Sequence, residues 1–78
     1  MKRRVKLTYP QDKIQDPLLF KMAKKYDIMP NIRRARVTDE VGEIVLELEG
    51  KTEDLDKGLA FLKKQSVEVE LIEGDVIE

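Results

Sequence analysis

The 78-residue sequence predicts an α+β fold in which two helices cover one face of an antiparallel sheet. Apolar and polar residues alternate along four segments, which is the pattern of half-buried strands. Apolar residues recur at three- and four-residue spacing along two further segments, which predicts helices. The six segments follow one another as strand, helix, strand, strand, helix, strand. The length fits a single domain over residues 1–78 with a thin core.

A proline ends the first strand, and another follows the first helix. Alternation over residues 3–9 predicts a strand that Pro10 ends. Its buried face holds Val5, Leu7 and Tyr9. We expect Asp16 to cap the first helix by accepting hydrogen bonds from free backbone N–H groups, with Pro17 at the first helical position. The apolar stripe of this helix, which ends before Pro30, consists of Leu18, Leu19, Met22, Ala23 and Tyr26.

The second strand, residues 31–38, has the weakest pattern. One face is predicted to hold Arg33, Ala35 and Val37, and the other Ile32, Arg34 and Arg36. A turn over residues 38–43 follows, in which Gly42 is expected to take a positive φ. The third strand, residues 43–49, has the clearest alternation. Its inward side chains are Ile44, Leu46 and Leu48, and its outward ones are Val45, Glu47 and Glu49.

The second helix and the fourth strand complete the order. Thr52 is the expected N-cap, with acidic residues in the first turn of the helix. The buried stripe of this helix consists of Leu55, Gly58, Leu59 and Leu62. Close packing against a strand would explain a glycine at position 58, because mid-helix glycine costs about 1 kcal/mol relative to alanine. Residues 66–72 alternate as a strand, and residues 74–78 form a tail.

Two split βαβ units with right-handed crossovers give the ferredoxin-like fold, with strand order 4-1-3-2 and both helices on one face. This order makes the outward charges of neighbouring strands complementary. From strand 4 to strand 2 they are Glu68 and Glu70, Arg4 and Lys6, Glu47 and Glu49, and Arg34 and Arg36. Pairing across the sheet accounts for a net charge of about +8 in residues 1–36 and about −9 in residues 37–78. It therefore weighs against nucleic acid as a partner.

The composition excludes several kinds of chemistry. The chain has no cysteine and no histidine, which removes thiol chemistry, most zinc sites and the commonest general base. The loop over residues 10–16 has no glycine to cradle a phosphate. We therefore expect no enzyme activity, no catalytic residue, no metal and no cofactor in this chain. No apolar run approaches the roughly 20 residues that span a bilayer, so a cytoplasmic domain without membrane insertion is expected.

The arginines at positions 33–36 have two interpretations. In one, Arg34 and Arg36 pair with glutamates of the third strand while Arg33 lies at a frayed edge; in the other, the cluster contacts an anion. Apolar residues on the charged open face and the unpaired sheet edges predict a docking surface or a homodimer interface. Its residues are Ile32, Arg34, Arg36, Val45 and Ile72. The core is expected to include Phe20, Met22, Tyr26 and Met29.

An ordered set of segments also carries a family resemblance. The segments are Val5–Tyr9, Asp16–Leu19, Tyr26–Ile28, Asn31–Ile32, Leu46–Gly50, Leu59–Lys63 and Val67–Val69. Together they make the chain similar to the NIL domain family over essentially its whole length. The family is named for Asn-Ile-Leu, whereas this chain has Asn31-Ile32-Arg33, so an arginine replaces the inward leucine.

The resemblance implies a non-catalytic, ACT-like regulatory domain connected with methionine and sulfur amino acid metabolism. In methionine-importing ABC transporter ATPases such domains dimerise and bind ligand near the start of this strand, which makes Asn31 and Ile32 the candidate contacts for a methionine-like ligand. The alternative role for Asn31 is to satisfy backbone groups beside Pro30.

The family's other setting is the N-terminus of small iron–sulfur proteins. The segment Leu71–Glu78 resembles the stretch before a ferredoxin module, and we expect the chain to be of this N-terminal type. Any iron–sulfur cluster would belong to that downstream module. The alternative function is a scaffold that docks a ferredoxin-type or sulfur-transfer partner through the open sheet face.

Overall fold

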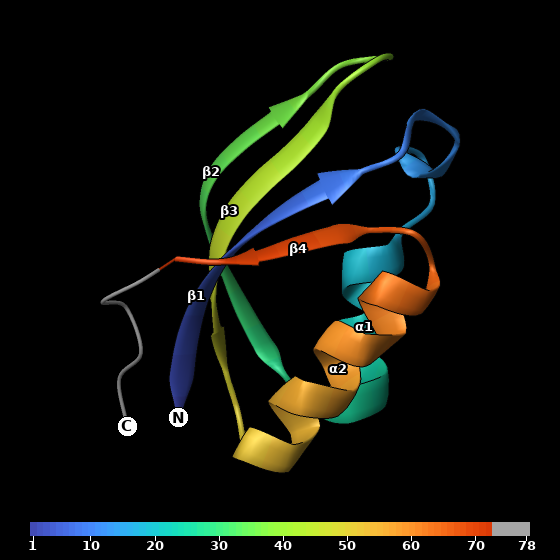
Figure 1. Ribbon diagram of the computed structural model, residues 1–78. Helices are drawn as coiled ribbons and strands as arrows, with labels where there is room; N and C mark the ends of the chain where they lie inside the picture. Colours follow the sequence, from blue (N-terminus) through green and yellow to red (C-terminus); the bar gives the residue numbers. More distant parts are fainter. Residues whose placement is uncertain (73–78) are drawn as a thin grey trace.

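Four antiparallel strands form one layer and two helices form the other in the computed structural model, which describes residues 1–72 (Figure 1). The elements are β1 (Lys2–Tyr9), η1 (Gln11–Lys13), α1 (Leu18–Tyr26), β2 (Met29–Val37), β3 (Gly42–Glu49), α2 (Thr52–Lys64) and β4 (Glu68–Leu71). The sheet order is β2-β3-β1-β4, which confirms the ferredoxin-like prediction of 4-1-3-2. The predicted tail, residues 74–78, lies outside the described residues.

Strand β1 lies in the interior of the sheet and pairs with β3 on one side and β4 on the other. Its inward residues Val5 and Leu7 are fully buried, and they lie opposite Leu46 and Ile44 of β3. The helices close this face with side chains that are also buried, among them Met22, Leu55, Leu59 and Leu62. Each such side chain contributes about 1.5–3 kcal/mol through burial. Neither helix in residues 1–72 is long and apolar enough to cross a bilayer.

Both predicted helix caps are wrong. Helix α1 begins at Leu18, and the carboxylate of Asp16 accepts a hydrogen bond from Lys21 Nζ at 3.0 Å instead of from backbone N–H groups. Helix α2 begins at Thr52 itself, whose hydroxyl donates to Met1 Sδ at 3.1 Å. In each case the side chain has a competing partner that the local sequence does not reveal.

Strand β2 contains a bulge that inverts part of its predicted pattern. Ile32 lies opposite Leu46 and Arg34 lies opposite Val45, so Arg33 is the extra residue. One extra residue shifts alternation by one position. Ile32 therefore shares the helix-facing side with Ala35, and its predicted place on the open face beside Arg34 and Arg36 is wrong. The predicted place of Arg33 on the side of Ala35 is also wrong.

The charges of the open face pair across strands, although not all as predicted. Arg4 lies opposite Glu47, with Nη2 at 3.8 Å from Oε2, which confirms the predicted neighbourhood. Lys6 pairs with Glu43 at 3.2 Å, not with Glu47 or Glu49. Arg33 Nη2 lies 3.6 Å from Glu47 Oε2. Arg33 therefore pairs with a glutamate of β3, as was predicted for Arg34 and Arg36.

Arg34 and Arg36 have no carboxylate within 4.0 Å in residues 1–72, so their predicted ion pairs are wrong. Arg36 does lie opposite Glu43 in the strand register, but the carboxylate of Glu43 is engaged by Lys6. The bulge and this competition together leave two guanidinium groups available on the β2 edge of the open face.

Gly58 brings the two helices together. A Cβ at this position would lie 2.5 Å from Ile28 Cδ1 and 2.8 Å from Met22 Sδ. The close packing predicted for Gly58 is therefore present, but it is against α1 and the residue before β2, and not against a strand.

We expect Gly58→Val to lower the free energy of unfolding by about 2 kcal/mol, because overpacking of a filled core costs about 1–3 kcal/mol. Urea denaturation followed by circular dichroism measures it. The matched control is Ala60→Val on the exposed side of α2, which should cost only the propensity difference of about 0.6 kcal/mol. Equal effects of the two substitutions would contradict the packing role of Gly58.

Candidate functional site

The predicted ligand contacts, Asn31 and Ile32, lie near the start of β2, on a strand at the edge of the sheet. Asn31 lies opposite Glu47 on the open face, whereas Ile32 lies opposite Leu46 on the helix-facing side. The structure thus does not bring the two side chains to one face. Within residues 1–72 the Asn31 amide makes no hydrogen bond, which counts against its alternative role of satisfying backbone groups beside Pro30. Its donor and acceptor are both available.

Exposed apolar side chains surround this edge. Phe20 is 65% exposed and Met29 is 67% exposed, so the prediction that both belong to the core is wrong. Met22 is fully buried as predicted, and Tyr26 is half-buried against Phe61. Ile32 and Val37 are also more than half exposed. A groove between α1 and β2 joins this surface, and it is lined by Leu19, Phe20, Ala23, Lys24, Ile28 and Pro30.

The five residues that were predicted to form an interface on the open face do not lie together. Arg34, Arg36 and Val45 line a shallow cavity of about 320 Å³ together with Lys6, Ala35 and Glu43. Ile72 follows β4 at the other edge of the sheet, where its backbone N–H donates to the Arg4 carbonyl oxygen at 3.1 Å. The structure therefore groups three of the predicted interface residues and leaves Ile32 and Ile72 elsewhere.

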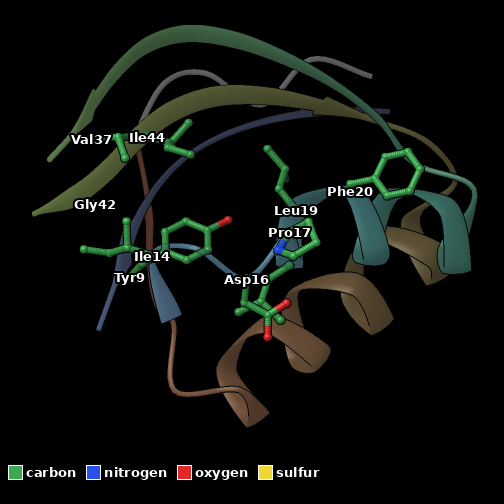
Figure 2. A pocket seen from close by; sticks show the side chains of 10 residues that line it. Tyr9, Ile14, Asp16, Pro17, Leu19, Phe20, Val37, Gly42 and Ile44 are labelled. Carbon is green, nitrogen blue, oxygen red and sulfur yellow. The ribbon is translucent and has the colours of Figure 1, made fainter. Parts of the chain in front are cut away.

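A second cavity, of about 310 Å³, lies between the sheet and the start of α1 (Figure 2). We call it the Tyr9 cavity. Its walls are apolar, and they come from β1, the segment before α1, α1 itself and the hairpin of β2 and β3. The lining residues are Tyr9, Ile14, Asp16, Pro17, Leu18, Leu19, Phe20, Val37, Gly42 and Ile44.

The chain builds this cavity by leaving the sheet at Pro10 and returning over it. The short helix η1 carries the chain outward, and Ile14 then packs over the first residue of β3, Gly42. A Cβ at position 42 would lie 3.1 Å from Ile14 Cγ1 and 3.2 Å from Tyr9 Cβ. The prediction that Gly42 needs a positive φ is wrong, and its small size is what the fold uses. The turn itself closes through Thr38, whose Oγ1 accepts from the N–H of Val41 at 3.0 Å.

Tyr9 is the unusual member of the cavity wall. It is only 8% exposed, and its buried hydroxyl has no hydrogen-bond partner in residues 1–72. Burial raises the pKa of Tyr9 to about 12, because desolvation disfavours the phenolate. The sequence analysis predicted that Tyr9 is buried but did not predict this cavity. The available signal was a phenol at the end of a buried stripe, next to a loop that carries the isolated apolar residue Ile14.

Comparison with known proteins gives a consistent result. A model of the NIL domain matches residues 3–71. The methionine import ATP-binding protein MetN of Lacticaseibacillus paracasei is 29% identical over 72 residues, which cover 87% of this chain and 21% of that protein. MetN 2 of Bacillus licheniformis is 24% identical over 74 residues, covering 90% of this chain and 22% of that protein. The chain thus spans about a fifth of the length of these relatives.

Solved structures show the same fold. The C-terminal domain of an ABC transporter ATP-binding protein from Enterococcus faecalis superposes with a TM-score of 0.79 at 19% identity, covering 94% of this chain and 86% of that one. A bacterial light-regulated adenylyl cyclase superposes with a TM-score of 0.55 at 20% identity, covering 100% of this chain and 23% of that one.

The raised pKa of Tyr9 predicts a specific pH dependence of stability. Below pH 10 the phenol is neutral in both the folded and the unfolded chain. Between pH 10 and about 12 the unfolded chain ionises first, so the folded state loses stability, by about 1.4 kcal/mol at pH 11. Urea denaturation at pH 8 and pH 11 measures the loss. Tyr9→Phe is the control, because this variant retains every other titratable group of the chain. The prediction would be contradicted if the free energies of unfolding of the two proteins differed by the same amount at pH 8 and at pH 11.

Proposed function

The chain belongs to the NIL domain family, and we propose that it is a non-catalytic regulatory domain that responds to a methionine-like amino acid. The family match over residues 3–71 and the methionine-import names of two relatives support this function. The chain itself has no glycine-rich phosphate loop, so nucleotide chemistry would belong to another part of a longer protein. A cytoplasmic location follows from the same proposal, because ATP-binding subunits work where ATP is available.

The observation that carries this proposal is the unengaged amide of Asn31 on an edge strand. An amide offers a donor and an acceptor, which suit the carboxylate and the ammonium group of an amino acid. Exposed Met29 lies two residues before it on the same side of the strand and supplies apolar contact for a side chain. This arrangement supports Asn31 as the polar contact, whereas exposed Ile32 faces the other side of the strand and would contact the ligand from a second copy of the chain.

We extend the proposal to a homodimer formed through the β2 edge. Asn31 and Ile32 of one chain point to opposite faces, so a ligand that touches both kinds of residue needs groups from a second copy. Among residues 1–72 no strand pairs with the outer edge of β2, and exposed apolar residues lie on β2 (Met29, Ile32 and Val37) and on neighbouring α1 (Phe20). Edge strands with such surfaces pair readily with another chain.

A second candidate function is a docking scaffold for a ferredoxin-type or sulfur-transfer partner, the setting in which a downstream module would carry the iron–sulfur cluster. The observation that favours it is the pair of guanidinium groups at Arg34 and Arg36, which lack carboxylate partners within residues 1–72. They flank Val45 in the shallow open-face cavity. Acidic groups of a partner would pair with them in a partly desolvated setting.

Titration with L-methionine and L-homocysteine tests the leading proposal. We expect the amide resonances of Asn31 and Ile32 to shift at millimolar ligand, and sedimentation velocity to show a dimer that ligand favours. Asn31→Ala should weaken binding about fivefold, since one hydrogen bond contributes about 1 kcal/mol. Gln15→Ala, an exposed amide elsewhere, should leave binding unchanged. The absence of shifts at Asn31 and Ile32 at 10 mM ligand, on the order of weak amino-acid affinities, would refute the proposal.

Charge reversal tests the scaffold. Arg34→Glu with Arg36→Glu should abolish capture of a purified bacterial ferredoxin while the circular dichroism spectrum stays unchanged. The matched control reverses Lys24 and Lys25 on the exposed side of α1 and should retain capture. Equal capture by both double variants would exclude the open face as the docking surface.

A further inference from the structure

We propose that the shallow open-face cavity is a binding site for a small phosphate monoester, whose phosphate group is held by Arg34 and Arg36. The helices cover the other face of the sheet, so the cavity is open to a ligand (Figure 1). Its lining residues are Lys6, Arg34, Ala35, Arg36, Glu43 and Val45. The site goes beyond a domain that responds to an amino acid, because the charge of the ligand and the residues that contact it both differ.

The charges around the cavity favour an anion. Three cations line it, namely Lys6, Arg34 and Arg36, together with the single carboxylate of Glu43. Lys6 Nζ lies 3.2 Å from Glu43 Oε2, so these two side chains neutralise each other. Neither arginine has a carboxylate within 4.0 Å in residues 1–72. Two guanidinium charges therefore remain uncompensated.

The other glutamates of the open face do not supply the missing negative charge. Glu47 is already engaged by two other arginines, at 3.8 Å and 3.6 Å. Glu49 lies at the far end of β3, and Glu68 and Glu70 belong to β4, at the opposite edge of the sheet from β2. A bound anion would supply the charge that the described part of the chain does not place beside Arg34 and Arg36.

The spacing of the two arginines favours a tetrahedral anion. After the bulge, Arg34 and Arg36 are two residues apart on the same face of β2, so their Cα atoms lie about 7 Å apart along the strand. Each guanidinium group presents a planar fork of N–H donors that matches phosphate oxygens. The three terminal oxygens of a phosphate monoester point in different directions and can accept from both forks, whereas one fork suffices for both oxygens of a carboxylate. The charge of such a monoester, about −1.5 to −2 at pH 7, also balances two guanidinium groups.

The remainder of the cavity sets the size of the organic part. Its volume of about 320 Å³ exceeds that of a phosphate group and accommodates roughly ten non-hydrogen atoms. Val45 is half-buried and lies between Arg34 and Lys6 in the strand register, so it gives the cavity an apolar floor. Guanidinium groups also stack on aromatic rings. A small apolar or aromatic group attached to the phosphate therefore fits over Val45.

Phenyl phosphate is a suitable probe, because it joins a dianionic phosphate to one apolar ring. In an NMR titration of the whole chain at low salt and about pH 7.5, we expect saturable shifts at the Nε–H groups of Arg34 and Arg36 and at the Val45 amide, with a dissociation constant on the order of 1 mM. Inorganic phosphate should shift the same groups but bind about fivefold more weakly, since it lacks the ring. Dimethyl phosphate has a single charge and two terminal oxygens, so it should bind at least about tenfold more weakly.

Substitution of the two arginines tests their role. Arg34→Gln with Arg36→Gln should weaken the binding of phenyl phosphate at least about tenfold, because both charge-assisted contacts are lost. Arg34→Lys with Arg36→Lys should weaken it about threefold, because the charges remain but the forks do not. The matched control, Lys24→Gln with Lys25→Gln, removes two exposed cations from α1 and should bind as the unmodified chain does.

Three results would overturn the proposal. One is the absence of saturable shifts at Arg34 and Arg36 with phenyl phosphate. Another is equal affinity of the double Arg→Gln variant and the α1 control, which would mean that phosphate is attracted without a defined site. The third is equal affinity for phenyl and dimethyl phosphate, which would mean that a single charge suffices.

Failure of this proposal is separable from failure of the functions proposed above. The amino-acid ligand is read at Asn31 and is tested with different probes. The docking scaffold shares Arg34 and Arg36 with the phosphate site, but it is tested by capture of a ferredoxin. Loss of that capture in the charge-reversal variant, together with no binding of phenyl phosphate by the unmodified chain, would support the scaffold and refute the phosphate site.

Discussion

The two-sided pairing of β1 is the constraint on which the other elements depend. Because β3 and β4 both bind this strand, its alternation fixes which face of the sheet is buried. Val5 and Leu7 define the face that the helices cover, and Arg4 and Lys6 define the open face. Tyr9 is the last inward residue of the same stripe, and it lies where the start of α1 and the segment before it cover the sheet. The cavity therefore lies between the end of β1 and the start of α1.

Much of the fold could be predicted because burial imposes a period on the sequence. Strands β1 and β3 are buried on one side, so a single register satisfies them, and the sheet order follows from chain connectivity. The bulge in β2, which shifts its alternation by one residue, could not be predicted in this way. Most of its residues are exposed on both faces, so no burial pattern marks Arg33 as the extra residue. The predictions of the helix caps failed for a related reason. Asp16 accepts a hydrogen bond from Lys21, and Thr52 donates one to Met1, and the capping preference of a residue does not reveal such contacts.

The bulge at Arg33 determines what the candidate site can offer. It directs Arg33 to Glu47, which already faces Arg4, and so it satisfies the most buried carboxylate of the open face with two cations. Arg34 and Arg36 are left without carboxylate partners in the described part of the chain. Ile32 and Asn31 lie on opposite faces by ordinary strand alternation, because the register shift comes only after Ile32. Arg33, at the position where the family's Asn-Ile-Leu pattern has leucine, is thus the residue of β2 that pairs with Glu47 on the open face.

The position of β2 also explains why a regulatory role suits this edge of the sheet. Within residues 1–72, β3 is the one strand that holds it by backbone hydrogen bonds, while β1, with its fully buried side chains, is held on both sides. Elements with few buried contacts open at a lower free energy than the core. A ligand or a second chain that binds β2 would therefore act on a strand whose own residues contribute little to the packed core. Asn31, near the start of β2, thus lies on the strand that contributes least to the core among the described residues that form the sheet.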